Sequence, residues 1–278
     1  MVDQLTFADE NRERIRAIEN SFGPAGKSLY KPDRILLGEG RLTKQSRRGQ
    51  QPKVFFLFND VLVYGSIILN GRWYKNQQII PLEEIKLEDL EDGFRMKNQW
   101  LIRTPRKSFY VAASSSDEKQ AWIEHMEDCR ARLLQSGRRA SSAFAVAWVP
   151  DHDSAICMRC KGKFNVTHRR HHCRKCGFVV CARCSKKKAV IEHIHPTKEL
   201  RICTVCHSNL DIEANSQDMN HKRDSIEKSS SDEDEPERSS DEDNTEEEME
   251  DHDPSKWMYS EGSLWSPYVY IKPEQLKH

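Results

Sequence analysis

The sequence predicts an α+β protein of two small domains. A seven-stranded antiparallel β-barrel or sandwich, capped by a C-terminal helix, is followed by a small cysteine-rich module and a disordered acidic tail. Short apolar runs separated by turn residues fill the first half of the chain, eight of nine cysteines fall between residues 157 and 206, and Ser, Asp and Glu dominate the segment that follows. With 37% hydrophobic and 32% charged residues, the chain is polar for a compact globule, which indicates that part of it is unfolded.

The N-terminal residues 1–33 are predicted to form a helix and a lead-in to the first domain. Apolar side chains between residues 7 and 22 recur at helical spacing among charges, and Gly23-Pro24 ends the pattern. We expect this helix to pack on the next domain. Seven β-rich runs then follow, separated by turn pairs such as Asn59-Asp60 and Asn70-Gly71, at residues 34–44, 53–58, 60–68, 73–81, 93–97, 99–104 and 107–113.

A helix is expected after the last of these strands. Ser115 to Glu118 has the pattern of a capping box, and Trp122 begins one apolar face of the helix. Seven strands closed by one helix with a Trp on its buried face resemble a pleckstrin-homology domain, here over residues 34–134. The resemblance implies that the helix plugs one open end of a bent barrel.

The same resemblance implies a phosphoinositide site between the first two strands. Four basic residues gather there, Lys44, Arg47, Arg48 and Lys53. The usual basic pattern of the second strand is incomplete, because Val54 and Phe55 follow Lys53. A loop whose charges only keep the protein soluble is the alternative.

Eight cysteines form four C-x-x-C pairs after a linker at residues 135–147. Two thiolates separated by two residues can turn onto one tetrahedral ion, so eight thiolates fill two closed sites of four cysteines each. A disulfide framework is the alternative, but the N-terminus lacks the apolar run of a signal peptide, so we expect a reducing, cytosolic compartment. The pattern therefore predicts two structural zinc ions, bound by Cys157, Cys160, Cys173, Cys176, Cys181, Cys184, Cys203 and Cys206.

The residues around these pairs distinguish between zinc families, since RING, PHD and nuclear-receptor modules also use such pairs. Trp148 to Asp151 precedes the first pair, Arg169 to Arg174 reads RRHHCR around the third ligand, and Arg201 to Cys203 leads into the last pair. These segments resemble the W-x-x-D, R-[RK]-H-H-C-R and R-x-C signatures of the FYVE zinc finger, with Ile202 where Val is usual. The resemblance covers residues 148–212 and implies a treble-type, two-zinc finger.

Cross-braced pairing follows from this family. The first ion would be held by Cys157, Cys160, Cys181 and Cys184, and the second by Cys173, Cys176, Cys203 and Cys206. From the sequence alone, sequential pairing remains open.

The arginines of the finger suit a phosphoinositide headgroup. A phosphomonoester with a charge of about −2 needs several guanidinium donors, and inositol hydroxyls need both donors and acceptors. A solvated surface face or extra metal ligation by His is the alternative. The resemblance implies that the 3-phosphate of phosphatidylinositol 3-phosphate meets Arg170, Arg174 and Arg201, the glycerol-linked phosphate meets Arg169, and the ring hydroxyls meet Asp151 and His172, with His171 in the same headgroup site.

The loop between Cys160 and Arg169 carries apolar residues flanked by bases. In the FYVE family this loop enters the bilayer, which places Val166 and Thr167 at the inserting tip, whereas Phe164 is expected in the core. Nearby lysines add attraction to an anionic surface.

Charge divides the chain unequally. Residues 1–213 carry 37 Lys and Arg against 25 Asp and Glu, a net charge of +12, whereas residues 214–253 carry 4 against 17, a net charge of −13. A basic body implies an anionic partner, and the acidic segment either keeps the protein soluble or competes for a basic lipid site. Residues 213–278 are predicted as a disordered acidic tail with an aromatic C-terminal segment, in which a partner-binding motif would use Trp257, Trp265, Tyr268 and Tyr270.

A lone pleckstrin-homology domain followed directly by a FYVE finger and an acidic tail resembles the phafin family. The resemblance implies a peripheral adaptor that binds phosphatidylinositol 3-phosphate on early endosomes, with other phosphoinositides at the first domain and roles at lysosomes, in trafficking and in autophagy. The alternative is a protein-binding zinc-finger scaffold of the small-GTPase effector type. Nucleic-acid binding is not expected without a recognition helix. Because no nucleophile, open metal site or phosphate loop is recognised, we predict that the protein is not an enzyme.

Overall fold

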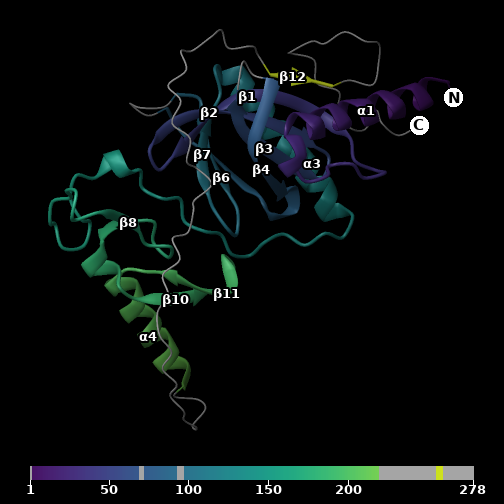
Figure 1. Ribbon diagram of the computed structural model, residues 1–278. Coiled ribbons are helices and arrows are strands. Elements are labelled where there is room, and N and C mark those ends of the chain that lie inside the picture. Colours follow the sequence, from purple (N-terminus) through teal and green to yellow (C-terminus); the bar gives the residue numbers. More distant parts are fainter. Residues whose placement is uncertain (1, 69–71, 93–96, 219–254, 259–278) are drawn as a thin grey trace. The chain divides into compact units, whose positions relative to one another are not determined.

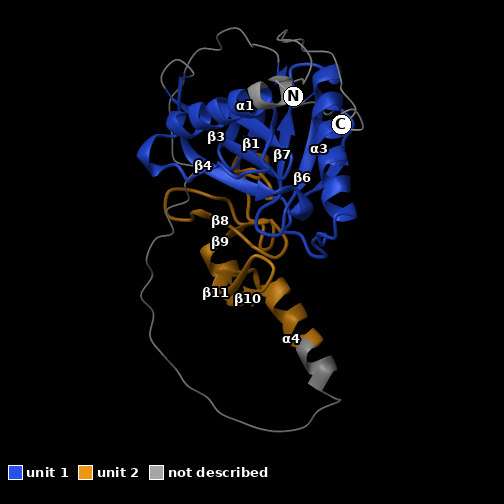
Figure 2. Ribbon diagram, turned by 90° about the vertical axis from the view of Figure 1, so that its right-hand side faces the viewer, with its two compact units in different colours: residues 1–147, 247–278 blue, residues 148–246 orange. Residues whose placement is uncertain are grey.

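The computed structural model describes residues 2–68, 72–92, 97–218 and 255–258, with side chains from residue 7 to residue 213 and again from 255 to 258. The chain forms two compact units, residues 1–147 with 247–278 and residues 148–246 (Figure 2). We call these unit 1 and unit 2. The Asn70-Gly71 turn, most of the strand predicted at 93–97 and most of the predicted acidic tail lie outside the described residues.

Unit 1 is built on one antiparallel sheet (Figure 1). Its strand order is β4-β3-β2-β1-β7-β6-β5, with one further short strand beside β1. Because β1 pairs with β2 along its length and with β7 near its C-terminal end, the sheet curls into a partly closed barrel. The seven strands are β1 (Leu36–Ser46), β2 (Gly49–Phe58), β3 (Val61–Ile68), β4 (Trp73–Pro81), β5 (Lys86–Asp89), β6 (Gln99–Arg103) and β7 (Phe109–Ala112). The predicted antiparallel barrel or sandwich is confirmed, and six of its seven predicted strands are present among the described residues. Strand β5 was not predicted, because its short sequence KLED is charged and lacks the apolar run that marked the others.

The second half of β2 is buried on both faces, because a helix covers each of them. Phe55 and Leu57 point to one hydrophobic cluster, and Val54, Phe56 and Phe58 point to another. This explains why the run KVFFLF shows no polar alternation.

The N-terminal helix α1 (Val2–Ser21) covers one of these faces. Ile15, Ile18 and Phe22 are buried there against the sheet. A Cβ atom at Gly65 of β3 would lie only 2.4 Å from the ring of Phe22, so glycine at this position lets the helix end approach the strand. The helix therefore packs on the first domain, as the sequence predicts.

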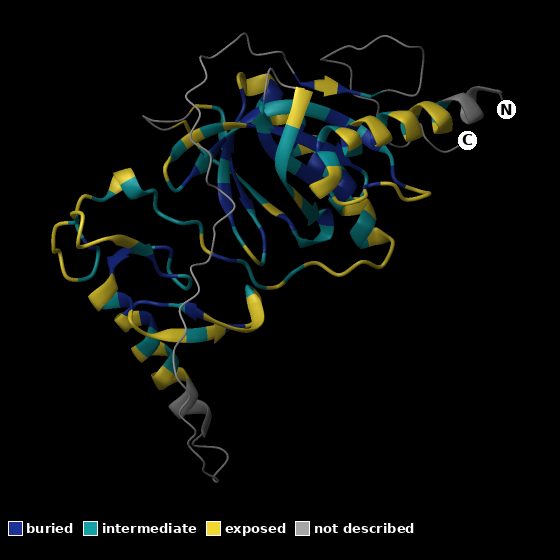
Figure 3. Ribbon diagram, viewed as in Figure 1, coloured by how far each residue is buried: buried dark blue, intermediate teal, exposed yellow. Residues whose placement is uncertain are grey.

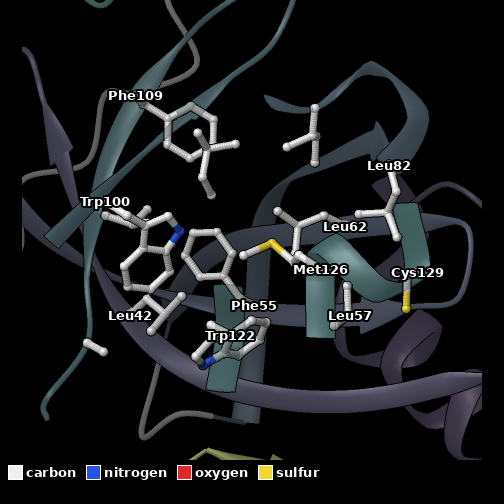
Figure 4. Packing of buried hydrophobic residues seen from close by; sticks show 14 of the residues in the cluster. Leu42, Phe55, Leu57, Leu62, Leu82, Trp100, Phe109, Trp122, Met126 and Cys129 are labelled. Atoms are coloured by element: carbon white, nitrogen blue, oxygen red, sulfur yellow. The ribbon is translucent and has the colours of Figure 1, made fainter. Parts of the chain in front are cut away.

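Helix α3 (Ser116–Gln135) closes the other face. Its N-terminus is capped by Ser115, whose side-chain oxygen accepts a hydrogen bond from the Glu118 amide at 3.1 Å. Trp122, Met126 and Cys129 enter the core (Figure 4), where Trp122 packs edge-on against Phe55 with ring centroids 6.3 Å apart. The helix is the plug that the sequence predicts.

A short strand from the far C-terminal part of the chain also belongs to unit 1. Strand β12 (Lys256–Trp257) pairs antiparallel with β1 at Gly38 and Glu39 (Figure 1). The sequence pattern predicts a disordered tail over all of residues 213–278. Residues 255–258 instead lie against unit 1, because alternate side chains of this segment enter the core.

Over its described residues, 148–218, unit 2 has little regular structure. It contains two short hairpins and a C-terminal helix, with bounds β8 (Arg170–His172), β9 (Val179–Cys181), β10 (Lys188–Ile191), β11 (His195–Arg201) and α4 (Thr204–Asp218). Its core consists largely of cysteines with a few aliphatic side chains, and most of its remaining residues are exposed or half-buried (Figure 3). Across the residues the structure describes, no helix is both long and apolar enough to cross a membrane.

Candidate functional site

Two groups of four cysteine sulfurs dominate unit 2. One consists of Cys157, Cys160, Cys181 and Cys184, the other of Cys173, Cys176, Cys203 and Cys206, and the sulfur atoms within each group lie within 4.8 Å of one another. The alternation of pairs along the chain is the cross-braced arrangement, so the sequential alternative is wrong.

The spacing of these sulfurs fits a zinc ion. A tetrahedral ion with Zn–S distances of about 2.3 Å requires sulfur atoms about 3.8 Å apart. The Cys160 and Cys181 sulfurs are 3.8 Å apart, and those of Cys176 and Cys203 are 4.0 Å apart. The donor set and its geometry therefore suit Zn²⁺ in a closed, structural site.

Hydrogen bonds favour the thiolate form of one cysteine in each group, Cys157 and Cys173. The Cys181 amide donates to the Cys157 sulfur at 3.3 Å, and the Cys203 amide donates to the Cys173 sulfur at 3.2 Å. Burial opposes ionisation of Cys157, yet backbone amides from Cys160, Cys181 and Arg159 lower its pKa to about 6. A hydrogen bond from Cys176 is the main cause that lowers the pKa of Cys173 to about 4. Burial instead raises the pKa of Cys184 to about 12 and that of Cys206 to about 11, so the charge of a metal ion is what favours the thiolate form at those two ligands.

Arg159 adds a positive charge to the second cluster. Its guanidinium donates to the sulfurs of Cys203 at 3.2 Å and Cys176 at 3.5 Å, and it stacks over the ring of Phe178. Four thiolates carry more negative charge than one Zn²⁺ neutralises, and this guanidinium offsets part of the excess. Arg159 was not predicted as a site residue, although its place inside the first C-x-x-C pair was the available signal.

The W-x-x-D segment lies directly against the RRHHCR segment. The ring of Trp148 stacks on His172 with centroids 4.9 Å apart, and the Arg174 guanidinium lies 4.2 Å from the Trp148 ring centroid. His172 is only 3% exposed, its Nε2 lies 2.7 Å from the Val149 carbonyl oxygen, and the same atom lies 3.7 Å from Asp151 Oδ1. The sequence motif predicted no contact for Trp148. In the structure its ring contacts both His172 and Arg174.

The third motif joins the same cluster through the backbone. The Arg174 amide donates to the Arg201 carbonyl at 2.9 Å, which sets the two arginines side by side in the fold. The Arg201 guanidinium donates to the Ser185 carbonyl at 2.9 Å. Arg170 lies over the ring of Phe164 at 4.8 Å, and its Nε donates weakly to the Ser154 carbonyl at 3.4 Å.

The pKa of His171 reflects the positive charges around it. Burial lowers the pKa of its imidazole, and the charges of Arg201, Arg174, His172 and Arg169 lower it further. Arg169 and Arg170 are exposed, whereas Arg174 and Arg201 are half-buried. Arg169, Arg174 and Arg201 therefore lie close enough to His171 to create a positive potential there, which disfavours protonation of its imidazole and favours an anion. His172, predicted as a headgroup residue, is instead buried.

The loop before Arg169 presents one apolar side chain to solvent. Val166 is 88% exposed, more than any other large hydrophobic residue among those described. The Asn165 carboxamide oxygen accepts hydrogen bonds from the Thr167 amide, the Thr167 hydroxyl and the His168 amide at 2.7 to 2.9 Å. This turn fixes the loop in shape and holds Val166 outward. Phe164 is half-buried and packs against the cysteine core.

The basic residues predicted for a second lipid site lie in unit 1, at the end of the barrel where β1 and β2 meet. Arg47 and Arg48 form the turn between these strands. Lys44 and Lys53 instead point into the barrel. The Lys44 ammonium lies 4.7 Å from the ring centroid of Phe109, and the Lys53 ammonium donates to the Ser66 hydroxyl at 2.7 Å. Two of the four residues are therefore covered, and two lie in the surface turn.

Comparisons with known proteins match both units. Residues 147–212 match the FYVE zinc finger family, and residues 31–129 match the SOS1/NGEF-like PH domain family. FYVE zinc fingers bind two zinc ions, and the two cysteine groups of unit 2 are the places where this chain binds them.

Relatives extend the match across both domains. The chain is 50% identical over 212 residues to pleckstrin homology domain-containing family F member 1 of Homo sapiens, which covers 76% of each chain. It is 46% identical over 212 residues to family F member 2 of Homo sapiens, covering 76% of this chain and 85% of the relative. Among solved structures, the LM5-1 FYVE domain from Leishmania major shares 40% identity over 23% of this chain and 77% of that chain, with a TM-score of 0.22.

Proposed function

The chain belongs to the pleckstrin homology domain-containing family F, the phafins, and from this premise we propose that it binds phosphatidylinositol 3-phosphate through unit 2. Its FYVE and PH domains make it a phosphoinositide-binding membrane adaptor. Both domain families are typically non-enzymatic. The protein acts by holding a membrane and its partners together, without catalysing a reaction.

One observation carries the proposal. Three motifs that lie far apart along the chain converge on a single basic surface. The Trp148 ring contacts both the His172 ring and the Arg174 guanidinium, and the Arg174 amide donates to the Arg201 carbonyl. The zinc ions do no chemistry at this surface. They fix the backbone from which the arginines project, which reduces the entropy lost when an anion binds.

Individual residues then take distinct roles. The 3-phosphate is bound by Arg170, Arg174 and Arg201, because guanidinium groups form paired hydrogen bonds with phosphate oxygens. Arg169 meets the phosphate that links the inositol to glycerol. Asp151 meets the ring hydroxyls, and the buried His172, whose Nε2 lies 2.7 Å from the Val149 carbonyl and 3.7 Å from Asp151, positions that segment.

Membrane insertion adds to headgroup binding. Val166 enters the bilayer at the tip of the turn that Asn165 organises, with Thr167 beside it at the interface. Exposed lysines of unit 2, at positions 161, 163, 186, 187 and 188, add about 1 kcal/mol each near an anionic surface.

Unit 1 provides a second phosphoinositide contact at the β1–β2 end of its barrel. Arg47 and Arg48 attract the anionic headgroup from the surface turn, whereas Lys44 and Lys53 are buried beside Phe109 and Ser66 and take no part in the contact. Two membrane contacts on one chain raise the overall affinity by about 10²- to 10⁴-fold over either alone. The adaptor works on early endosomes, and also on lysosomes in trafficking and autophagy.

Vesicle co-sedimentation tests the assignment of the site. The full chain is compared as wild type, Arg170→Ala and Arg183→Ala, the last being an exposed arginine of the same unit that lies outside the three motifs. Loss of a charged hydrogen bond costs about 1.5–3 kcal/mol, so Arg170→Ala weakens binding to vesicles with phosphatidylinositol 3-phosphate about 10- to 150-fold. Arg183→Ala leaves it within about twofold, within the usual small effect of a surface substitution. An equal loss of vesicle affinity in both variants would mean that unit 2 binds through nonspecific electrostatic attraction. Unchanged affinity in Arg170→Ala would favour a protein-binding scaffold.

A further inference from the structure

The segment Ser255–Met258 lies in a groove of unit 1 between β1 and α3. Its side chains alternate, with Ser255 and Trp257 buried and Lys256 exposed. Trp257 is 3% exposed and belongs to the main hydrophobic cluster of the unit. The segment is separated from the last described residue of α4 by residues 219–254, so a distant part of the chain supplies a side chain to the core of the first domain.

Two glycines of β1 make room for this segment. A Cβ atom at Gly38 would lie 2.3 Å from the ring of Trp257, and one at Gly40 would lie 2.0 Å from the Ser255 hydroxyl oxygen. Both distances are far below van der Waals contact. Glycines at alternate positions of one strand thus form a notch, which two alternate side chains of the segment fill.

Polar groups at the floor of the groove bind the Ser255 end. The Trp122 indole donates to the Ser255 hydroxyl at 2.8 Å, and the Glu118 carboxylate accepts from the Ser255 amide at 3.1 Å and from its hydroxyl. Glu118 also accepts from the Ser114 amide at 2.9 Å. The same carboxylate therefore binds both the start of α3 and the docked segment.

The other end is held by ring stacking and by the strand backbone. The Trp257 ring stacks on His125 with centroids 3.9 Å apart and an interplanar angle of 10°, and it contacts Trp122 at 4.9 Å. The Met258 amide donates to the Leu37 carbonyl at 2.7 Å. Sheets recognise added peptide strands by backbone hydrogen bonds and by pockets for alternate side chains, and both features are present here.

We propose that the β1–α3 groove is a peptide-binding site specific for an extended Ser-x-Trp strand, and that its resident ligand is the chain's own Ser255–Met258. Two features give the specificity. The absence of side chains at Gly38 and Gly40 leaves room for the peptide's Ser and Trp side chains. The Glu118–Trp122 pair selects a small hydroxyl residue two positions before the tryptophan. Docking holds residues 255–258 on unit 1.

Hydrogen–deuterium exchange of the intact wild-type chain is the first test. The amides of Ser255 and Met258 exchange at least tenfold more slowly than those of the flanking residues 250–253 and 262–265. In Trp257→Ala the slow exchange at 255–258 is lost, whereas Trp265→Ala, a matched tail tryptophan, retains it. Exchange at 255–258 as fast as in the flanking residues of the wild type would overturn the proposal.

A labelled peptide of residues 252–260 provides the second test. It binds full-length Trp257→Ala and Ser255→Asp, in which the groove is vacated, and it binds the wild type and Trp265→Ala at least tenfold more weakly because the resident segment competes. Ser255→Asp serves if Trp257→Ala fails to fold, since the substituted carboxylate repels Glu118 without opening a cavity. Adding Gly40→Val to either vacated variant abolishes peptide binding, while exchange protection in β2 and β3 remains.

Two outcomes contradict the assignment. Equal affinity for wild-type and vacated chains would place the peptide elsewhere, and no binding to a vacated chain that keeps β2 and β3 protected would show that the groove has no affinity for this sequence. Vesicle binding does not enter either test, so the proposal stands or falls independently of the lipid site.

Discussion

Removing one zinc site should unfold unit 2 and leave unit 1 intact. Cys173→Ser removes a ligand that is fully buried and that accepts an amide hydrogen bond from Cys203. A structural zinc contributes about 10–16 kcal/mol in finger-sized modules. A typical domain is stable by only about 5–15 kcal/mol. Because the apolar core of unit 2 is small, the free energy lost with one zinc ion exceeds the stability that the remaining contacts provide.

Metal analysis combined with hydrogen–deuterium exchange measures this effect. The wild type contains two zinc ions per chain, and Cys173→Ser contains at most one, with residues 157–206 exchanging rapidly and β1 to β7 remaining protected. Cys129→Ala is the matched control, because Cys129 is buried in unit 1 and lies in neither cysteine group. This control retains two zinc ions. The reasoning fails if Cys173→Ser keeps two ions, or if its unit 2 stays protected after a chelator has removed them.

Three further results are expected. Trp122→Ala leaves a cavity where α3 closes the barrel and lowers the free energy of unfolding of unit 1 by about 3–5 kcal/mol in denaturant titrations. A loss below about 1 kcal/mol would mean that this side chain is not needed to close the barrel. Val166→Glu weakens vesicle binding about tenfold but leaves the affinity for a soluble short-chain lipid unchanged. The control Val205→Glu on α4 changes neither affinity. If Val166→Glu lowered both affinities in parallel, Val166 would belong to the headgroup site. Arg48→Gln in the exposed β1–β2 turn lowers vesicle affinity without changing the binding of unit 2 to soluble phosphatidylinositol 3-phosphate. Unaltered vesicle affinity would contradict a second contact at this turn.

The sequence predicted the parts of the fold that local pattern encodes. Apolar runs, turn pairs and the capping serine at position 115 located most strands and helix α3, and the spacing of cysteines predicted both metal sites. Cross-bracing came only from the family resemblance, since four identical C-x-x-C pairs carry no pairing information. The structure supplied it through the meeting of Cys157 with Cys181 and of Cys173 with Cys203.

Long-range contacts account for what the sequence did not reveal. The docking of Trp257 depends on Gly38 and on His125, residues far away along the chain, and a single tryptophan after an acidic run shows no periodicity. Burial of Lys44 and Lys53 also escaped prediction, because a basic residue in a strand gives no sign that an aromatic ring or a hydroxyl will cover it.

Exchange protection by a soluble lipid tests the central claim most directly. Short-chain phosphatidylinositol 3-phosphate is added to the intact wild-type chain, and amide exchange is compared with that in the presence of the 5-phosphate isomer. The 3-phosphate isomer should slow exchange in residues 148–154, 169–174 and 199–203 together, because the three motifs form one basic surface, and the 5-phosphate isomer should have little effect there. Equal protection by both isomers, or protection that spares all three segments, would contradict the account.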